Sequence, residues 1–213
     1  MKIEVWSDIV CPFCYIGKRH LEIALQQLSL SHVTIEWKSF QLDPTITPDM
    51  EGTPTTEYLM QTKGIPANQI QPKLSRVEEM AKNAGLDYAL QKNVVTNTRK
   101  CHQLLQWAKS QGKGAELKEK FLHAYFIQNK NLSALHELDQ CLEETGLSLS
   151  LAHEALQNEN WDSQVQHDID EARRLGISGV PFFVFNEQFG LSGAQPVEKF
   201  VETIQHVLSV TKE

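Results

Sequence analysis

Hydrophobic and polar positions alternate in two short segments near the start of the chain, with a longer helical pattern between them. Residues 2–8 and residues 33–40 alternate, which predicts two strands. Residues 12–29 carry leucine and alanine at helical spacing, with Pro12 at the position near a helix start where proline is best accepted. A β-α-β unit of this length is suited to two parallel strands with a right-handed crossover.

The pattern from about residue 54 to residue 175 is almost wholly helical. Thr53 can cap a first helix that has Pro54 at its first position. Apolar residues recur at helical spacing in six further segments, and glycine is expected to end four of these helices. The four terminating glycines are Gly85, Gly112, Gly146 and Gly176.

Strand patterns return near the end of the chain. Residues 181–185 form an apolar run typical of a buried strand, and Asn186-Glu187 is expected to turn into a second strand at residues 188–191. Pro196 begins a last helix with one continuous apolar stripe. The element order is therefore β-α-β, a helical block, and then β-β-α.

Without the helical block, this order describes a four-stranded sheet with flanking helices, which is a thioredoxin-like plan. We therefore predict an α/β fold with a discontinuous thioredoxin-like domain and an inserted all-helical domain. The thioredoxin-like domain is expected to comprise residues 1–50 and 176–213, together with part of the helix at 161–175. The helical insertion is expected to comprise residues 51–175.

Composition limits the classes of partner. The 213 residues include 20 Lys and Arg against 27 Asp and Glu, a formal net charge of −7. This balance argues against nucleic acid or an anionic membrane as the main partner, because both favour clustered positive charge. No run approaches the roughly 20 apolar residues that cross a bilayer. The N-terminus enters a strand pattern without the features of a secretory signal, so we expect a cytoplasmic protein.

Cys11 and Cys14 lie one helical turn apart at the first strand–helix junction. In a reducing compartment, this spacing favours redox chemistry. With Cys11 at the N-cap and Cys14 at the third helical position, the free amides and the dipole of the helix favour a Cys11 thiolate. Cys11 is then the nucleophile that attacks a disulfide, and Cys14 is the resolving thiol that releases the trapped substrate.

A zinc site is the competing interpretation of Cys-x-x-Cys, and it requires two more ligands at matching spacing. The other two cysteines, Cys101 and Cys141, are far apart, and neither belongs to a second such pair. Both fall on apolar helix faces, where packing is the default role of a free cysteine. We therefore expect no metal site.

Several residues close to the cysteine pair have two interpretations. Pro12-Phe13 provides no charge, and Phe13 offers an apolar contact for peptide-like substrates. Asp8 either influences thiolate formation or forms hydrogen bonds within the turn. Glu36 and Lys38 share a strand face, where they either relay protons to Cys14 or form a solvated ion pair, and the ion pair is favoured.

Gly179-Val180-Pro181 precedes the buried strand near the C-terminus. Pro181 cannot complete a central ladder, so it marks the first residue of that strand or a special peptide bond. Because cis bonds are a small minority of X–Pro bonds, these residues alone favour trans.

The segment from Cys11 to Lys18 resembles the motif of the DsbA-like thioredoxin-fold family, specifically its FrnE-type cytoplasmic branch. Further segments resemble that branch in the same order, so the resemblance covers nearly the whole chain. They are Ser39–Pro44, Asn97-Thr98 with His102, Gly179–Phe183 and Ser192–Pro196. The chain departs from the branch in having Phe13 where tryptophan is common and Cys101 where alanine is common.

The resemblance implies a thiol–disulfide oxidoreductase or isomerase with Cys11 as nucleophile and Cys14 as resolving residue. It also implies a cis Val180-Pro181 bond that faces Cys11, with the Val180 backbone available to pair with a substrate. Pro12 and Phe13 would then line the substrate cleft beside Val180 and Pro181.

Asn97 and His102 are further candidates for the cleft. Asn97 is also a natural N-cap, and that structural role is the favoured one. His102 lies at the start of a helix, where contact with a substrate or glutathione and a role in packing are equally favoured.

The same superfamily includes 2-hydroxychromene-2-carboxylate isomerases and kappa-class glutathione transferases, in which a serine replaces the nucleophile and glutathione binds. Both cysteines are present here, which favours redox chemistry, and a glutathione-dependent isomerase or transferase is the alternative. We expect no required cofactor, with glutathione as a candidate co-substrate. The expected partners are protein or small-molecule disulfides and thiols, without nucleic acid or membrane, and the choice between monomer and homodimer stays open.

Overall fold

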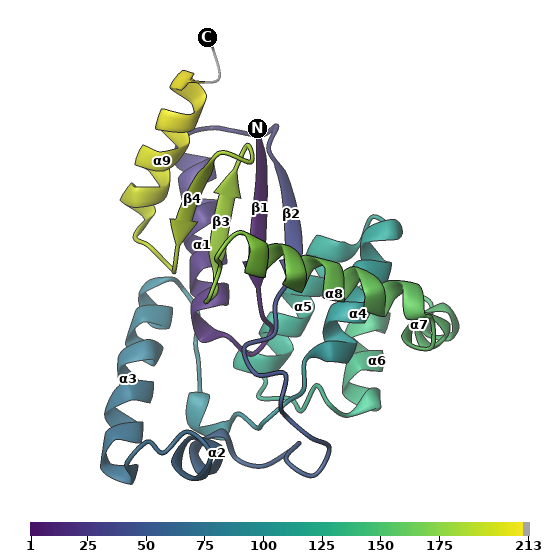
Figure 1. Ribbon diagram of the computed structural model, residues 1–213. Coiled ribbons are helices and arrows are strands. Elements are labelled where there is room, and N and C mark those ends of the chain that lie inside the picture. Colours follow the sequence, from purple (N-terminus) through teal and green to yellow (C-terminus); the bar gives the residue numbers. More distant parts are fainter. Residues whose placement is uncertain (211–213) are drawn as a thin grey trace. The chain divides into compact units, whose positions relative to one another are not determined.

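The computed structural model describes residues 1–210, so the last three residues of the expected thioredoxin-like domain, 211–213, lie outside the described part. The chain divides into two compact units (Figure 1). The first, which we call the sheet unit, comprises Met1–Leu42 and the chain from Asp168 onward. The second, the helical unit, comprises Asp43–His167. The division falls within one continuous helix, α8 (Glu159–Arg174).

A mixed sheet in the order β2-β1-β3-β4 is the centre of the sheet unit. β1 pairs in parallel with β2 and antiparallel with β3, and β3 pairs antiparallel with β4. The predicted α/β, thioredoxin-like arrangement is therefore confirmed. The strands are β1 (Lys2–Ser7), β2 (Thr34–Ser39), β3 (Phe182–Phe185) and β4 (Phe189–Ser192).

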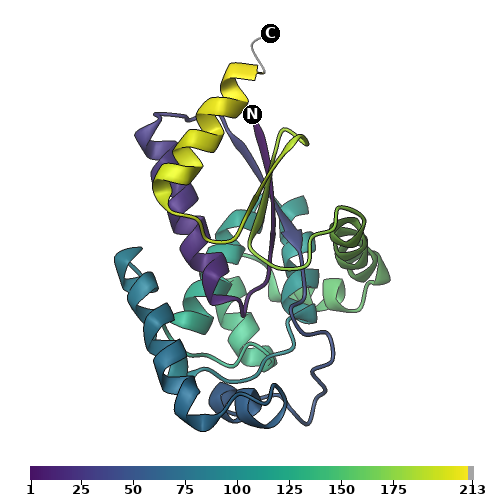
Figure 2. The same ribbon diagram turned by 60° about the vertical axis from the view of Figure 1, so that its left-hand side comes forward.

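The alternation in each strand separates the two faces of the sheet. Val5 and Phe183 lie on a face covered by α1 (Pro12–Gln27) and α9 (Val197–Val210), which run side by side (Figures 1 and 2). The rings of Phe183 and Phe200 meet edge to face with their centroids 4.8 Å apart. This face forms the larger apolar core of the sheet unit, and the apolar stripe of α1 packs against it.

The opposite face of the sheet carries Trp6, which packs with Ala172 of α8 and with Ile177. The Trp6 indole Nε1 donates a hydrogen bond to the carbonyl oxygen of Asp168 at 3.0 Å. Because Trp6 is completely buried, this bond satisfies a polar group that would otherwise be costly to bury. The end of α8 is thereby joined to the centre of the sheet.

The predicted turn between the last two strands is confirmed at Asn186-Glu187. Both residues have positive φ, 48° and 59°. Such angles belong to the two-residue hairpin turn whose twist matches that of antiparallel strands.

Every helix that the spacing predicts between residues 54 and 175 is present. The core residues of the helical unit include Leu104, Leu117, Phe121, Leu138 and Leu142, which are completely buried. Two predicted helix starts lie one residue too early: α2 begins at Thr55 with Pro54 as its N-cap, and α9 begins at Val197, not at Pro196. Pro54 is extended, and its carbonyl accepts from the amides of Glu57 and Tyr58. The helices are α2 (Thr55–Gln61), α3 (Ala67–Asn83), α4 (Arg99–Ser110), α5 (Gly114–Phe126), α6 (Leu135–Glu144), α7 (Leu149–Leu156), the first part of α8, and a 3₁₀ turn at Leu90–Lys92.

Among residues 1–210, no helix combines the length and the apolar character that a membrane span requires.

Candidate active site

Cys11 and Cys14 occupy the positions at the start of α1 that their spacing predicts. Cys11 is the N-cap, with an extended backbone (φ −86°, ψ 111°), and Pro12 is the first helical residue. The amide of Cys14 donates to the carbonyl oxygen of Cys11 at 3.0 Å, which closes the first turn. Cys11 is 2% exposed and Cys14 is 1% exposed. The strand–helix junction therefore holds both thiols at one end of the sheet, one helical turn apart.

The Cys11 sulfur faces the loop that precedes β3. Cys11 Sγ donates to the carbonyl oxygen of Val180 at 3.3 Å. The Val180-Pro181 peptide bond is cis, as the family resemblance implied, whereas the residues alone favoured trans. Within the described chain, the Cys11 side chain makes no capping hydrogen bond to α1. The sulfur thus donates to the loop and accepts no hydrogen bond from the first-turn amides of α1.

Gly17 allows α1 to approach this loop closely. A Cβ atom at this position would lie 3.0 Å from Pro181 Cγ and 3.2 Å from Phe183 Cζ. Contacts that short are tighter than normal packing, so a side chain here would displace its neighbours. Sequence reasoning did not single out Gly17, although a glycine inside a helix is a signal of close approach.

Phe13 provides apolar surface beside the cysteine pair. Phe13 is 38% exposed, and it is the aromatic residue among the exposed large apolar residues of the described chain. Phe13 directly precedes Cys14 and lies two residues after Cys11, so it is close to both thiols in the chain. Because the residue is exposed, an apolar group that approaches the thiols can contact its ring.

Asp8 binds the turn before Cys11. Its Oδ1 accepts from the amide of Ile9 at 2.7 Å, and its Oδ2 accepts from the amide of Leu42 at 2.8 Å. The side chain is 1% exposed. These bonds support the structural interpretation of Asp8, which joins the segment after β1 to the segment after β2.

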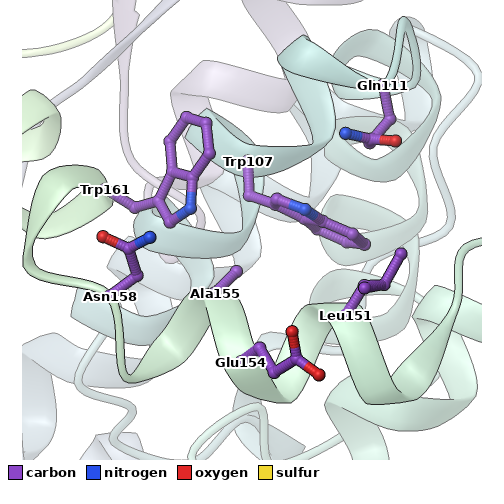
Figure 3. Close-up of a pocket in the computed structure, with 7 residues that line it drawn as sticks. All are labelled: Trp107, Gln111, Leu151, Glu154, Ala155, Asn158 and Trp161. Atoms are coloured by element: carbon purple, nitrogen blue, oxygen red, sulfur yellow. The ribbon is translucent and has the colours of Figure 1, made fainter.

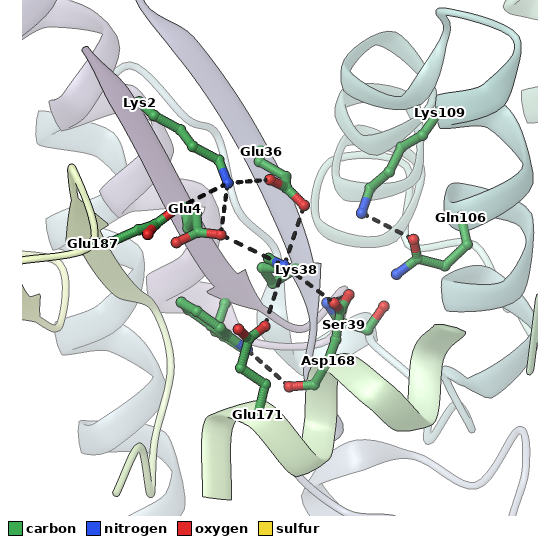
Figure 4. A network of polar contacts seen from close by, with 11 residues as sticks. Lys2, Glu4, Glu36, Lys38, Ser39, Gln106, Lys109, Asp168, Glu171 and Glu187 are labelled. Atoms are coloured by element: carbon green, nitrogen blue, oxygen red, sulfur yellow. Dashed lines mark hydrogen bonds and ion pairs between the residues drawn. The ribbon is translucent and has the colours of Figure 1, made fainter. Parts of the chain in front are cut away.

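Lys38 lies in a cluster of carboxylates on the side of the sheet opposite the larger apolar core (Figure 4). Its Nζ is 3.2 Å from oxygens of Glu36 and Glu171, 3.5 Å from Glu4 and 3.6 Å from Asp168. The Lys38 side chain is only 10% exposed. The predicted ion pair with Glu36 therefore exists, but the expectation that it is solvated is wrong, because carboxylates from β1 and α8 enclose it.

Electrostatic interactions in this cluster keep Lys38 charged. Burial lowers the pKa of Lys38, but the negative charges of Asp168 and Glu36 outweigh burial and raise the pKa above its ordinary value. For Glu36 the balance is similar. Burial raises its pKa, but the hydrogen bond from Lys2 and the charge of Lys38 outweigh burial, so the pKa of Glu36 is below its ordinary value. Lys38 is thus a fixed cation at neutral pH.

Asn97 and His102 belong to the helical unit. Asn97 Nδ2 donates to the carbonyl of Ile46 at 2.9 Å, and its Oδ1 accepts from the amide of Arg99 at 3.0 Å, so it stabilises the start of α4. The N-cap itself is Thr98, one residue later than expected. His102 lies in the first turn of α4 and is 1% exposed. A contact of either residue with substrate stays a prediction.

The remaining cysteines, Cys101 and Cys141, are also free and buried. Burial, followed by the negative charge of Glu144, raises the pKa of Cys141 to about 11. Cys101 Sγ is 4.0 Å from the carbonyl oxygen of Leu132. Both thiols fit the packing role that the sequence favours.

Comparison with known proteins supports the resemblance. A model of the DSBA-like thioredoxin domain matches residues 2–205. The uncharacterized protein YwbO of Bacillus subtilis (strain 168) is 28% identical over 213 residues, which cover 95% of this chain and 96% of that protein. The crystal structure of SCO1869 from Streptomyces coelicolor, described as a probable DsbA oxidoreductase, is 31% identical with a TM-score of 0.92. The match covers 98% of this chain and 90% of that one.

A more distant structure shares the fold. The cytosolic disulfide reductase DsbM from Pseudomonas aeruginosa, solved with GSH, has a TM-score of 0.66 and is 15% identical. That match covers 98% of this chain and 100% of DsbM. At this identity the likeness concerns the fold alone.

Proposed function

The chain belongs to the DSBA-like thioredoxin domain family, and we propose that it is a thiol–disulfide oxidoreductase that reacts through Cys11 and Cys14. The observation that carries the proposal is the 3.3 Å hydrogen bond from Cys11 Sγ to the carbonyl oxygen of Val180. It joins the first thiol of α1 to the loop that leads into a central strand. The resemblance assigns recognition of the substrate backbone to that same loop.

The reaction exchanges one disulfide for another. The Cys11 thiolate attacks one sulfur of a substrate disulfide, the substrate S–S bond breaks, and the second substrate sulfur leaves as a thiolate that takes a proton from solvent. The Cys14 thiolate then attacks the Cys11 sulfur and releases the first substrate sulfur. The substrate gains two electrons and two protons, and the protein retains a Cys11–Cys14 disulfide. The reverse sequence oxidises a dithiol substrate.

The surroundings of Cys11 suit a peptide-like substrate. When Cys11 loses its hydrogen, the carbonyl of Val180 loses the donor that it has in the reduced protein. A backbone N–H of a bound peptide can then replace that donor. The exposed ring of Phe13 offers an apolar contact close to the nucleophile. Peptide disulfides are therefore the substrate class that we favour.

Reduction of insulin disulfides tests the proposal. The reduced wild-type protein is expected to reduce insulin, and Cys11→Ser is expected to lower the rate by about a thousandfold, because serine cannot form the mixed disulfide. Cys101→Ser is the matched control, since it also removes a buried thiol, and it should retain the wild-type rate. Equal rates for wild type and Cys11→Ser would reject the assigned nucleophile.

Glutathione is the alternative substrate, and the fold shared with DsbM, which was solved with GSH, motivates it. DsbM is also described as cytosolic, and we include a cytoplasmic setting, where glutathione is abundant, in the proposal. A glutathione-dependent isomerase or transferase would bind glutathione without consuming a protein disulfide. Calorimetric titration of the reduced protein distinguishes the two candidates: absence of binding at millimolar glutathione counts strongly against the alternative.

A further inference from the structure

The helical unit contains a pocket with two tryptophans, which we call the tryptophan pocket (Figure 3). It has a volume of about 290 Å³. Its walls include Trp107 of α4, Leu151, Glu154 and Ala155 of α7, Asn158 just after α7, and Trp161 of α8. All of these residues lie within the helical unit, so the pocket shares no residue with the sheet unit that carries the cysteine pair.

Helical spacing aligns the residues on one side of this pocket. Leu151, Glu154 and Ala155 stand three and four residues apart, which puts them on one face of α7. Asn158 continues this stripe, and its carbonyl oxygen accepts from the amide of Trp161 at 3.1 Å. The start of α8 is therefore held against the end of α7, and α4 packs against α7 to bring in Trp107.

The indole N–H groups of Trp107 and Trp161 make no hydrogen bond within the described part of the chain. Trp107 is 6% exposed, and over residues 1–210 neither its N–H nor that of Trp161 donates to a protein acceptor. Trp6 behaves differently, because its indole N–H donates to the Asp168 carbonyl. Neither indole nitrogen belongs to the fully buried atoms that lack a partner in the described chain, so both N–H groups are accessible and can donate to an acceptor from outside the chain.

Glu154 provides the only formal charge among the lining residues. Its carboxylate accepts from the hydroxyl of Ser150 at 3.5 Å, and within the described part of the chain it has no lysine or arginine partner. An anionic ligand would therefore be repelled, whereas a cation would meet a carboxylate beside two aromatic rings. Tryptophan is the side chain whose ring attracts cations best.

We propose that the tryptophan pocket binds a small organic cation, an alkylammonium group that also carries an oxygen. The carboxylate of Glu154 is the counterion, the rings of Trp107 and Trp161 form the aromatic walls, and their N–H groups are available to the ligand oxygen. At about 290 Å³, the pocket lies just below the roughly 300–1,000 Å³ range of ligand sites, which suits one head group and not a large molecule.

The test uses the ¹⁵N-labelled full-length protein and the indole N–H signals of its four tryptophans in NMR. Each signal is assigned from a Trp→Phe variant. We expect choline to bind with a dissociation constant of about 1 mM, because a few weak contacts provide the free energy of binding that this value requires. The signals of Trp107 and Trp161 should shift, while those of Trp6 and Trp37 should stay in place.

A neutral ligand and two variants decide between a cation site and a merely apolar pocket. 3,3-Dimethyl-1-butanol has the shape of choline without its charge, and we expect it to bind at least about tenfold more weakly. Glu154→Gln should weaken choline binding by about tenfold, and Trp161→Leu should weaken it similarly. Glu143→Gln, which removes a carboxylate from exposed surface outside the pocket, should have no effect.

Equal binding of the neutral ligand, or unchanged binding in Glu154→Gln, would overturn the proposal, as would no shift at Trp107 and Trp161 at tens of millimolar choline. A second titration with N-acetyl-lysinamide identifies the source of the cation. Tighter binding of choline indicates a free metabolite, whereas tighter binding of the lysine compound indicates a side chain of a partner protein. Both results support the ammonium chemistry.

Discussion

The two sets of cysteines have contrasting environments, although all four thiols are free and buried. In the sheet unit, Cys11 lies at a helix start and donates to the carbonyl of Val180. In the helical unit, Cys141 lies within α6, and burial raises its pKa to about 11. Two buried thiols can therefore have very different surroundings: Cys11 is bonded to a loop carbonyl at a helix start, whereas Cys141 lies within a helix in the core of the helical unit.

Removing the second thiol of each set would test this contrast most strongly. Cys14→Ser should accumulate a mixed disulfide between Cys11 and the substrate, because no thiol is then positioned to resolve it. Cys141→Ser should turn over normally and accumulate none. Non-reducing electrophoresis after mixing with a labelled peptide disulfide measures both results. If the adduct fails to form in Cys14→Ser, or forms equally in both variants, the two sets do not differ in the proposed way.

Lys38→Met tests whether the charged cluster of the sheet unit stabilises the fold that holds the thiols. The substitution leaves the negative charges of Glu4 and Asp168 with less positive charge to balance them in a mostly buried site. We therefore expect the free energy of unfolding to fall by about 3 kcal/mol. Lys2→Met removes a lysine that is 40% exposed and should cost about 1 kcal/mol or less. Urea denaturation measures both changes. Equal losses in the two variants would show that the enclosure of Lys38 has no energetic consequence.

Gly17→Ala tests the close approach of α1 to the loop that accepts the Cys11 hydrogen bond. The added methyl would press on Pro181 and Phe183, and we expect a loss of about 1–3 kcal/mol in stability together with several-fold slower insulin reduction. Gly179→Ala is the control, since no heavy atom of the described chain other than those of Gly179 and its two chain neighbours lies within 4 Å of the position that its added methyl carbon would take. It should change stability by less than about 0.5 kcal/mol. Comparable effects of the two substitutions would argue against a packing requirement at Gly17.

The smallest expected effect concerns Cys141 and pH. Its pKa in the folded protein is raised from 9.0 to about 11, so the buried thiol contributes fully to stability below pH 9. As the pH rises from 9 to 11, the unfolded protein loses the proton first, and we expect the free energy of unfolding to fall by about 1–2 kcal/mol. Cys141→Ala should remove this part of the pH dependence. A decline of the same size in Cys141→Ala would assign it to other groups.

The sequence predicted the elements well, because their signals are local. Alternation predicted the first two strands, and an apolar run followed by a turn predicted the last two. Helical spacing predicted the helices, and glycines marked their ends, as at Gly85 and Gly146, both with positive φ. Three starts are displaced by one residue, at Pro54, Asn97 and Pro196. The difference in free energy between neighbouring start positions is small. The cysteine pair was also recognisable, because its chemistry depends on a spacing of three residues.

Interactions between distant segments could not be predicted. Lys38 was expected to be solvated, but Asp168 and Glu171 enclose it. These two residues lie more than 120 positions away in the chain, so the local pattern around Lys38 did not reveal them. The bond from the Leu42 amide to Asp8 and the close approach at Gly17 likewise depend on packed neighbours. Spacing within a segment carries no information about which segment will lie opposite.

The sequence by itself determined the order of strands and helices, the position of Cys11 at a helix start, and the distance of one turn to Cys14, since each follows from local backbone geometry. Tertiary structure alone decided the rest. It brought the Val180 carbonyl to the Cys11 sulfur across 169 residues, enclosed Lys38 in carboxylates, and assembled the tryptophan pocket from three helices. These features depend on burial, which removes water and obliges each polar group to find its partner in a distant part of the chain.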